Sequence, residues 1–254
     1  MAGACAPVSA PAPAPAPFVT GGGKTKGELP DVVAIRDPAE RYCSGVLIHP
    51  RLVLTARHCN TQDSRVYFGD DARARNARSV RVTKRRDAKL NPTSRPLVSG
   101  ALKDAPVMLV LESEVLDVDP RRLADLSGIA NEPIARVAGF GYDAPDAFGT
   151  EGVKRSATIK IRSPACTESD VGGRSAAAVY GCTPALDLVA GGEGIDTCEG
   201  DSGGPLYLPG PKKTWLLAAL TSRGANVQQC GQGGVYMRLD HYREWISNLK
   251  ALYP

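Results

Sequence analysis

A tight, glycine-rich turn surrounds Ser202 in the stretch Gly-Asp-Ser-Gly-Gly-Pro, residues 200–205. Glycine lets the backbone pass close to this serine where a side chain would block it. A tight turn can also direct several N–H groups inward, which creates an anion-binding site. An exposed hydroxyl beside such donors suits nucleophilic attack on a carbonyl, because an oxyanion forms there. Taken alone, the stretch is equally consistent with an ordinary surface turn.

Two other stretches carry groups that would activate Ser202. A short apolar strand over residues 54–56 runs into His58, and catalytic groups often lie where a rigid element ends. Asp104 opens the apolar run 105–111. A carboxylate at that point needs a partner, because an unpaired buried charge is costly, and a histidine N–H is a suitable one. The three residues then fit a triad of nucleophile, general base and an aspartate that fixes the imidazole tautomer.

The elements that must position these groups are short β-type runs separated by turn residues. Many short strands without helical periods between them are typical of an antiparallel barrel or sandwich. The runs occupy residues 32–35, 46–48, 52–54, 107–111, 134–138, 158–161, 215–221 and 235–239. Near the C-terminus, apolar residues recur at helical spacing after a candidate cap at Asp240. They are Tyr242, Trp245, Ile246 and Leu249.

With these motifs in this order, the chain resembles a trypsin/chymotrypsin-type serine protease over about residues 19 to 252. The resemblance implies an all-β fold of two six-stranded antiparallel barrels, with the active site in the cleft between them and a C-terminal helix. It implies a first barrel over residues 19–125 and a second over 126–254, after an Ala/Pro-rich tail or propeptide over 1–18. His58 and Asp104 would come from the first barrel and Ser202 from the second.

The composition is that of a soluble globular protein. The chain has 254 residues, of which 43% are hydrophobic and 23% charged, enough for one large domain or two small ones. No run of 18 apolar residues is present, so we expect no membrane span. The formal net charge of +4 does not by itself imply a nucleic-acid partner. We expect a monomer.

Seven cysteines are present, and the resemblance implies that six of them form disulfides. The implied pairs are Cys43–Cys59, Cys166–Cys182 and Cys198–Cys230. Such bridges imply an oxidising compartment. Zinc is the alternative, but the chain has no Cys-x-x-Cys and its histidines lack ligand spacing, so we expect neither metal nor cofactor. Ala135 and the region near Leu208 lack the cysteines of a bridge common in the family.

The tail over residues 1–17 is dominated by alternating Ala and Pro, which favours an extended polyproline II spacer. It lacks the continuous apolar stretch of a signal peptide. We expect a secreted or extracellular protein whose signal peptide is not present in this sequence. Cys5 is left over from the disulfides. The stretch Ala-Gly-Ala-Cys is similar to the end of a bacterial lipoprotein signal, which would make Cys5 a lipid anchor; a free thiol in the tail is the alternative.

The resemblance also assigns a specificity pocket. Asp196 lies six residues before Ser202, and in trypsin-like members an aspartate at this offset forms the floor of the pocket for the residue before the cut bond. There it pairs with Arg or Lys, which discriminates against neutral side chains. Gly224 and Gly234 match the pocket walls, where larger residues would block a long basic side chain. A carboxylate that only solvates a loop is the alternative for Asp196.

Further positions around this pocket take their roles from the same resemblance. The backbone N–H groups of Gly200 and Ser202 would form the oxyanion hole. Ser222 would serve as a hydrogen-bonding partner near the triad, and Glu199 at the pocket rim would disfavour acidic substrate residues. Arg223 departs from the family, which usually has tryptophan there, so substrate preferences beyond the first subsite stay open.

Family members become active when cleavage frees an Ile- or Val-Gly-Gly-type amine that inserts beside the aspartate preceding the nucleophile. The segment Val-Thr-Gly-Gly beginning at Val19 is the best match, with Asp201 as its partner, because a buried carboxylate and ammonium must pair. Phe18 precedes it rather than Lys or Arg, so we expect another protease to perform the maturation. Phe18 and Thr20 are alternative termini.

A basic segment lies between residues 73 and 89. Its cations are Arg73, Arg75, Arg78, Arg81, Lys84, Arg85, Arg86 and Lys89. A solvated surface loop with an edge strand is one interpretation. A binding surface for acidic partners is the other, and salt should weaken such binding.

The sequence therefore predicts a secreted serine endopeptidase that cuts protein or peptide substrates after Arg or Lys through an acyl-enzyme. Protein inhibitors are further candidate partners. Two alternatives stay open at this point. One is a non-catalytic binding protein on a protease scaffold, and the other is a narrow, regulated protease with one protein substrate.

Overall fold

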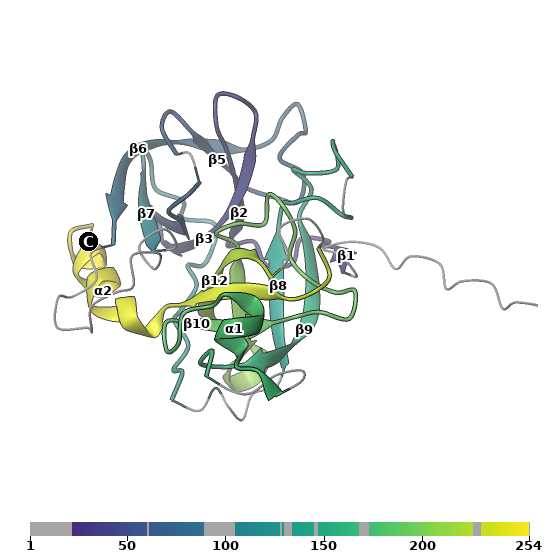
Figure 1. Ribbon diagram of the computed structural model, residues 1–254. Helices are drawn as coiled ribbons and strands as arrows, with labels where there is room; N and C mark the ends of the chain where they lie inside the picture. The colour runs from purple at the N-terminus through teal and green to yellow at the C-terminus, as the bar shows by residue number, and fades with distance from the viewer. Residues whose placement is uncertain are drawn as a thin grey trace, which may run out of the picture.

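Two closed antiparallel β-barrels, packed against each other, make up the computed structural model (Figure 1). They confirm the predicted all-β fold of two six-stranded barrels with a C-terminal helix. The structure describes residues 22–59, 61–88, 105–127, 129, 134–144, 147–167, 173–225 and 230–253. The tail 1–18 with Cys5, the candidate terminus Val19 and the candidate triad member Asp104 lie outside these ranges.

The first barrel closes in the order β2-β3-β4-β7-β6-β5. Its strands are β2 (Val32–Arg36), β3 (Tyr42–His49), β4 (Leu52–Ala56), β5 (Arg65–Tyr67), β6 (Ser79–Asp87) and β7 (Pro106–Leu111). Alternate residues along β7 enter two different clusters: Leu109 packs inside the barrel, and Met108 packs with residues of the second barrel. This strand is buried on both faces, which explains its uninterrupted apolar sequence.

The second barrel is a ring of six strands. They are β8 (Ile134–Gly139), β9 (Arg155–Ser163), β10 (Asp187–Ala190), β11 (Pro205–Pro209), β12 (Trp215–Gly224) and β13 (Gly234–Arg238). The β8–β9 pairing closes the ring, and β1 (Gly23–Lys24) adds to β9 from outside. Short helical pieces complete the element order: α1 (Ala176–Tyr180) and the 3₁₀ turns Pro211–Lys213 and Asp240–Tyr242.

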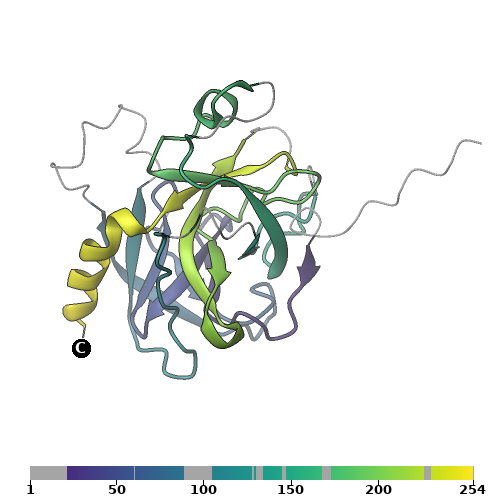
Figure 2. The same ribbon diagram turned by 90° about the horizontal axis from the view of Figure 1, so that it is seen from below.

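The C-terminal helix α2 (Arg243–Ala251) lies against the first barrel, although it follows the last strand of the second (Figure 2). Ile246 is buried there, and Arg51 stacks over the ring of Tyr253. The predicted cap was wrong. Asp240 begins a 3₁₀ turn and its carboxylate pairs with Arg238 at 2.7 Å, so it does not cap the helix.

All three predicted disulfides form: Cys43–Cys59, Cys166–Cys182 and Cys198–Cys230, with Cα–Cα distances of 6.1, 6.0 and 5.2 Å. The first joins β3 to the turn that follows β4, and the third joins the loop before β11 to the loop before β13. Ala135 and Leu208, at the positions of the bridge that is missing, are buried in one apolar cluster. Apolar packing takes the place of that bridge.

Candidate active site

His58 stands in a tight turn at the end of β4. Cys59 N donates to Ala56 O at 3.2 Å, which closes the turn, and Arg57 N donates to Ala105 O at 3.1 Å. The disulfide then fastens Cys59 to β3. The His58 side chain is exposed. Since Ala105 directly follows Asp104 in the sequence, the described chain next to this aspartate runs alongside the histidine turn.

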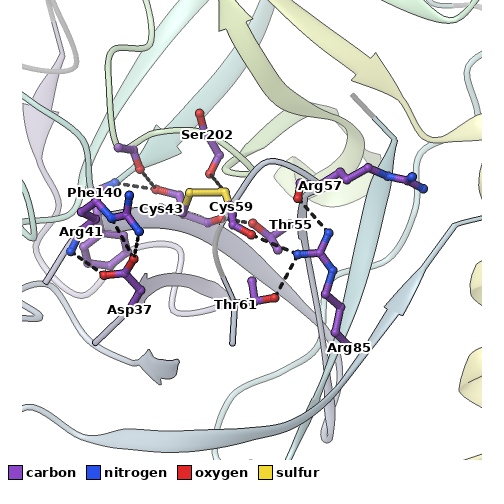
Figure 3. Close-up of a disulfide and its surroundings, with 12 residues drawn as sticks. Asp37, Arg41, Cys43, Thr55, Arg57, Cys59, Thr61, Arg85, Phe140 and Ser202 are labelled. Atoms are coloured by element: carbon purple, nitrogen blue, oxygen red, sulfur yellow. Dashed lines mark hydrogen bonds and ion pairs between the residues drawn. A yellow bond between two sulfur atoms is a disulfide. The ribbon is translucent and has the colours of Figure 1, made fainter. Parts of the chain in front are cut away.

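Ser202 lies in a loop of the second barrel that is bonded to the first. Ser44 N donates to Ser202 O at 2.9 Å, and Ser44 Oγ donates to Gly200 O at 2.9 Å. The sulfur of Cys59 lies 3.6 Å from Ser202 O (Figure 3). Gly203 has a φ of +80°, and a β-carbon there would lie 2.7 Å from Ala56 N. Only glycine permits this approach between the two barrels.

His58 and Ser202 together line one cavity of about 440 Å³, with Gly200, Glu199 and the Cys43–Cys59 disulfide. The structure thus brings the candidate base and nucleophile into one site, although they are 144 positions apart in the chain. The Ser202 hydroxyl makes no hydrogen bond within the described part of the chain. Catalytic hydrogen bonds are often long before substrate binds.

Ser44 on β3 holds the loop that carries the candidate oxyanion hole. Gly200 has a φ of +92°, and its carbonyl is turned toward Ser44 Oγ. Ser44 Oγ also accepts from Phe140 N at 2.9 Å, which holds it in place. The N–H groups of Gly200 and Ser202 donate to no other described residue. Ser44 was missed by the sequence analysis, because a serine after a cysteine has no spacing signal of its own.

Asp196 is buried, with 1% of its surface exposed, so it does not solvate a loop. Its Oδ1 accepts from Thr197 N at 2.7 Å and from the Tyr236 hydroxyl at 3.3 Å. Its Oδ2 is buried and has no hydrogen-bond partner among the described residues. Burial is the main cause that raises the pKa of Asp196 from 3.8 to about 7. A β-carbon on Gly234 would lie 2.8 Å from Oδ1, so glycine keeps the approach open.

The other predicted pocket residues lie on β12 and in the Ser202 loop. Gly224 on β12 lies opposite Gly234 on β13. Ser222 is buried, and its Oγ accepts from Arg223 Nη1 at 3.0 Å. Arg223 also donates to Gly181 O at the end of α1. Its guanidinium is thereby held against the end of α1. Glu199 is exposed and lines the cavity that His58 and Ser202 share.

Within the described ranges, no group of three or more His, Cys, Asp and Glu side chains could hold a metal ion. None of the helices in the described part has the length and apolar character that crossing a bilayer needs.

A protein-family model described as Trypsin matches residues 18–246. The chain belongs to the trypsin family. Curated trypsin-family relatives include snake venom serine protease 1 of Craspedocephalus gramineus, 29% identical over 247 residues and covering 92% of this chain and 88% of the relative. Human kallikrein-2 is 28% identical over 242 residues, covering 90% and 88%.

Transmembrane protease serine 9 of the rat is 28% identical over 252 residues, covering 90% of this chain. This chain spans only 22% of that relative's length. Among solved structures, neuropsin, a serine protease expressed in the limbic system of mouse brain, superposes with a TM-score of 0.68 at 25% identity. That alignment covers 90% of this chain and 98% of neuropsin. The resemblance to trypsin-type serine proteases is confirmed.

Proposed function

We propose that this trypsin-family chain is a secreted endopeptidase that hydrolyses peptide bonds after Arg or Lys. The observation that carries the proposal is Asp196 Oδ2, which is buried and has no partner among the described residues. A buried carboxylate oxygen that receives no hydrogen bond is costly. A guanidinium or ammonium group of a substrate supplies both the missing donors and the opposite charge, and charge-assisted bonds of this kind are strong.

In the proposed mechanism, Ser202 Oγ attacks the substrate carbonyl while His58 takes its proton. The N–H groups of Gly200 and Ser202 stabilise the oxyanion, and Asp104 orients the imidazole. His58 then protonates the leaving amine, which leaves an acyl group on Ser202. Water, activated by the same imidazole, hydrolyses the acyl-enzyme. A non-catalytic binding protein is not favoured, because His58 and Ser202 are both present and line the same cavity.

The test compares arginyl and phenylalanyl amide substrates, with Ser202→Ala as the control. We expect hydrolysis of the arginyl substrate that the Ser202→Ala variant lacks. A preference for the phenylalanyl substrate would overturn the role of Asp196 and leave that of Ser202 intact.

We also propose that Asp201 binds the new N-terminus at Val19 after cleavage. Asp201 is buried and accepts from Gly141 N and Cys198 N, both at 2.8 Å. Burial is the main cause that raises its pKa from 3.8 to about 6, so a cation would stabilise its charged form. A β-carbon on Gly139 of β8 would lie 3.0 Å from the carboxylate carbon. β1 lies two strands away, beyond β9.

The segment between Val19 and β1 is long enough for the amine of Val19 to reach Asp201. Two strand spacings are about 10 Å, and four residues of extended chain span about 13 Å. Val19 lies four positions before Gly23 in β1. Mass spectrometry of the mature protein should therefore find Val19 as the first residue, after cleavage by another protease. A mature terminus that follows Lys or Arg would contradict the assignment.

The basic segment supports a third proposal, a surface for an acidic polypeptide. Several of its cations are already paired, such as Arg73 with Asp71 at 3.2 Å. Arg81 and Lys84 have no hydrogen bond or ion pair from their side chains to a described residue. Both line a cavity of about 560 Å³. Arg81 also lies opposite Arg65 across β5 and β6, and facing like charges repel, so an anionic partner would relieve this repulsion.

We expect a polyglutamate peptide to bind more weakly as salt rises, and Lys84→Glu to weaken it further, whereas Lys160→Glu on the second barrel has no effect. Binding that is insensitive to salt would contradict this surface. Lys89 lies outside the described residues.

The three disulfides and the venom relative support an extracellular location for this chain.

A further inference from the structure

The side chain of Arg85 bonds to the backbone on both sides of His58. Its Nη2 donates to Arg57 O at 2.8 Å, and its Nη1 donates to Cys59 O at 3.2 Å. Nη1 also donates to Thr61 Oγ1 at 3.2 Å. Figure 3 shows this guanidinium placed against the turn, at the end of the disulfide away from Arg41. One side chain thus holds the two carbonyls that flank the candidate base.

A bulge in β6 explains how a residue of this basic strand faces the active site. Val82 pairs with Leu111 and Lys84 with Val110, so β6 has one extra residue between these pairs. Such an insertion moves every later side chain to the other face of the sheet. Arg85 therefore pairs with Leu109, whose side chain belongs to the interior cluster of the first barrel. The guanidinium reaches the histidine turn from that side of the sheet.

Asp87 keeps the guanidinium in this orientation. Asp87 lies two residues after Arg85 on β6, so the two side chains are on the same face of the sheet. Asp87 Oδ1 accepts from Arg85 Nε at 3.3 Å and from Arg85 Nη2 at 3.0 Å. The arginine fork is planar and presents its donors in fixed directions. With one edge held by Asp87, its remaining N–H groups point at the carbonyls. The N–H groups of Arg85 therefore already have partners within the protein, and we do not assign Arg85 to the proposed surface for acidic partners.

We propose that Arg85 is a positioning residue for His58, which it keeps aligned with Ser202 through the carbonyls of Arg57 and Cys59. The proposal rests on the proposed function, because it assigns a role within that reaction. Lysine would not replace it, since an ammonium group is a single point donor rather than a fork. A misplacement of about 1 Å in a catalytic group can cost about 10²-fold in rate.

The experiment measures the rate at which a small sulfonyl fluoride modifies Ser202, because this reaction needs the histidine and does not depend on the Asp196 pocket. We expect Arg85→Gln to lower this rate, and kcat for the arginyl amide, by about 10- to 100-fold. KM and the Kd of benzamidine should stay within about twofold of the wild type, since neither reports on His58 alignment. Arg85→Lys should resemble Arg85→Gln.

Arg65→Gln is the matched control. Arg65 is an arginine of the same barrel, exposed on β5, and its side chain bonds only to Ser79 in the described part of the chain. This variant should react with the sulfonyl fluoride as the wild type does. Asp87→Asn leaves the arginine in place and loosens its orientation, so it should show a smaller loss, about threefold.

Rescue separates positioning from a structural role. Added guanidinium ion should restore the sulfonylation rate of Arg85→Ala, because it can occupy the vacated position between the carbonyls. An Arg85→Gln rate equal to the wild type would overturn the proposal. So would a loss that appears only with a lower Tm and is not restored by guanidinium. A mature wild type, cleaved before Val19, that sulfonyl fluoride leaves unmodified would instead overturn the proposed function, and the role of Arg85 with it.

Discussion

The Ser202→Ala variant is expected to lose kcat for the arginyl amide by about 10⁵- to 10⁶-fold, the size found when the serine of such a triad is removed. The reason is the loss of the hydroxyl that forms the acyl bond in the proposed mechanism. Binding should persist, because Asp196 and the glycines of the pocket are unchanged. We expect benzamidine to bind this variant with the wild-type Kd in a calorimetric titration.

Stability provides an internal control for this variant. Ser202 is half-buried, and its hydroxyl makes no hydrogen bond to another residue in the described ranges. Its removal should therefore leave Tm nearly unchanged. His58→Ala should cost a similar factor in kcat, and the double variant should be no slower than either single one, because the two residues act as a unit. Additive losses, or a Ser202→Ala variant within tenfold of the wild type, would mean that another residue is the nucleophile.

Asp196→Asn is expected to change activity and stability in opposite directions. With the charge removed, a substrate guanidinium would be buried without its counter-ion. This should lower kcat/KM for the arginyl amide by roughly 10²- to 10⁴-fold, the cost of truncating one partner of a buried ion pair. Hydrolysis of the phenylalanyl amide should not fall. Undiminished arginyl activity would show that the basic side chain binds elsewhere.

The stability change follows from the raised pKa of Asp196. The unfolded carboxyl ionises near pH 4, whereas the buried one stays protonated up to about pH 7. The folded state therefore binds more protons in this window, and Asp196 lowers the free energy of unfolding progressively as pH rises from about 4 to 7. A difference of about 3 between the two pKa values corresponds to about 4 kcal/mol. The penalty is complete above pH 7 and absent below pH 4.

Asp196→Asn should remove this cost of ionising a buried carboxyl. It should add a smaller cost, because the amide N–H₂ of the asparagine would be a buried donor at the position where Oδ2 had no partner. We expect the free energy of unfolding to rise by about 2 kcal/mol at pH 8 and not at pH 4, measured by urea denaturation. Asp37→Asn is the matched control. Asp37 is also buried, but it accepts from Ala39 N, Arg41 N and Arg41 Nε, each at 2.9 Å. Its replacement should destabilise the fold at pH 8.

Several elements were predictable because their signals are local. The strands β2, β4, β7 and β8 are apolar runs bounded by turn residues, and each formed where it was predicted. The edge strand expected in the basic segment was wrong, because β6 pairs with β5 on one side and with β7 on the other. β5, β10 and β11 were missed. β5 has three residues, and β11 begins and ends with proline. Such strands form because neighbouring strands pair with them, which a local pattern does not record.

The cap predicted at Asp240 failed for a different reason. Aspartate before an apolar helical period is a sound capping signal. In the folded chain, however, Arg238 at the end of β13 pairs with this carboxylate, and the helix starts three residues later. A local ion pair with a residue only two positions earlier outweighed the capping preference.

The types and spacing of residues along the chain predicted the glycine-rich turn at Ser202, the histidine after a strand and the apolar strands. The resemblance predicted the cysteine pairing. Only the tertiary structure decided that Asp196 is buried with one oxygen unpaired, that Ser44 bonds to the Gly200 carbonyl, and that Arg85 faces the histidine turn. The physical reason is that burial and hydrogen bonding depend on groups far apart in the sequence. A one-residue bulge in β6, which composition does not reveal, decides which face of the sheet Arg85 occupies.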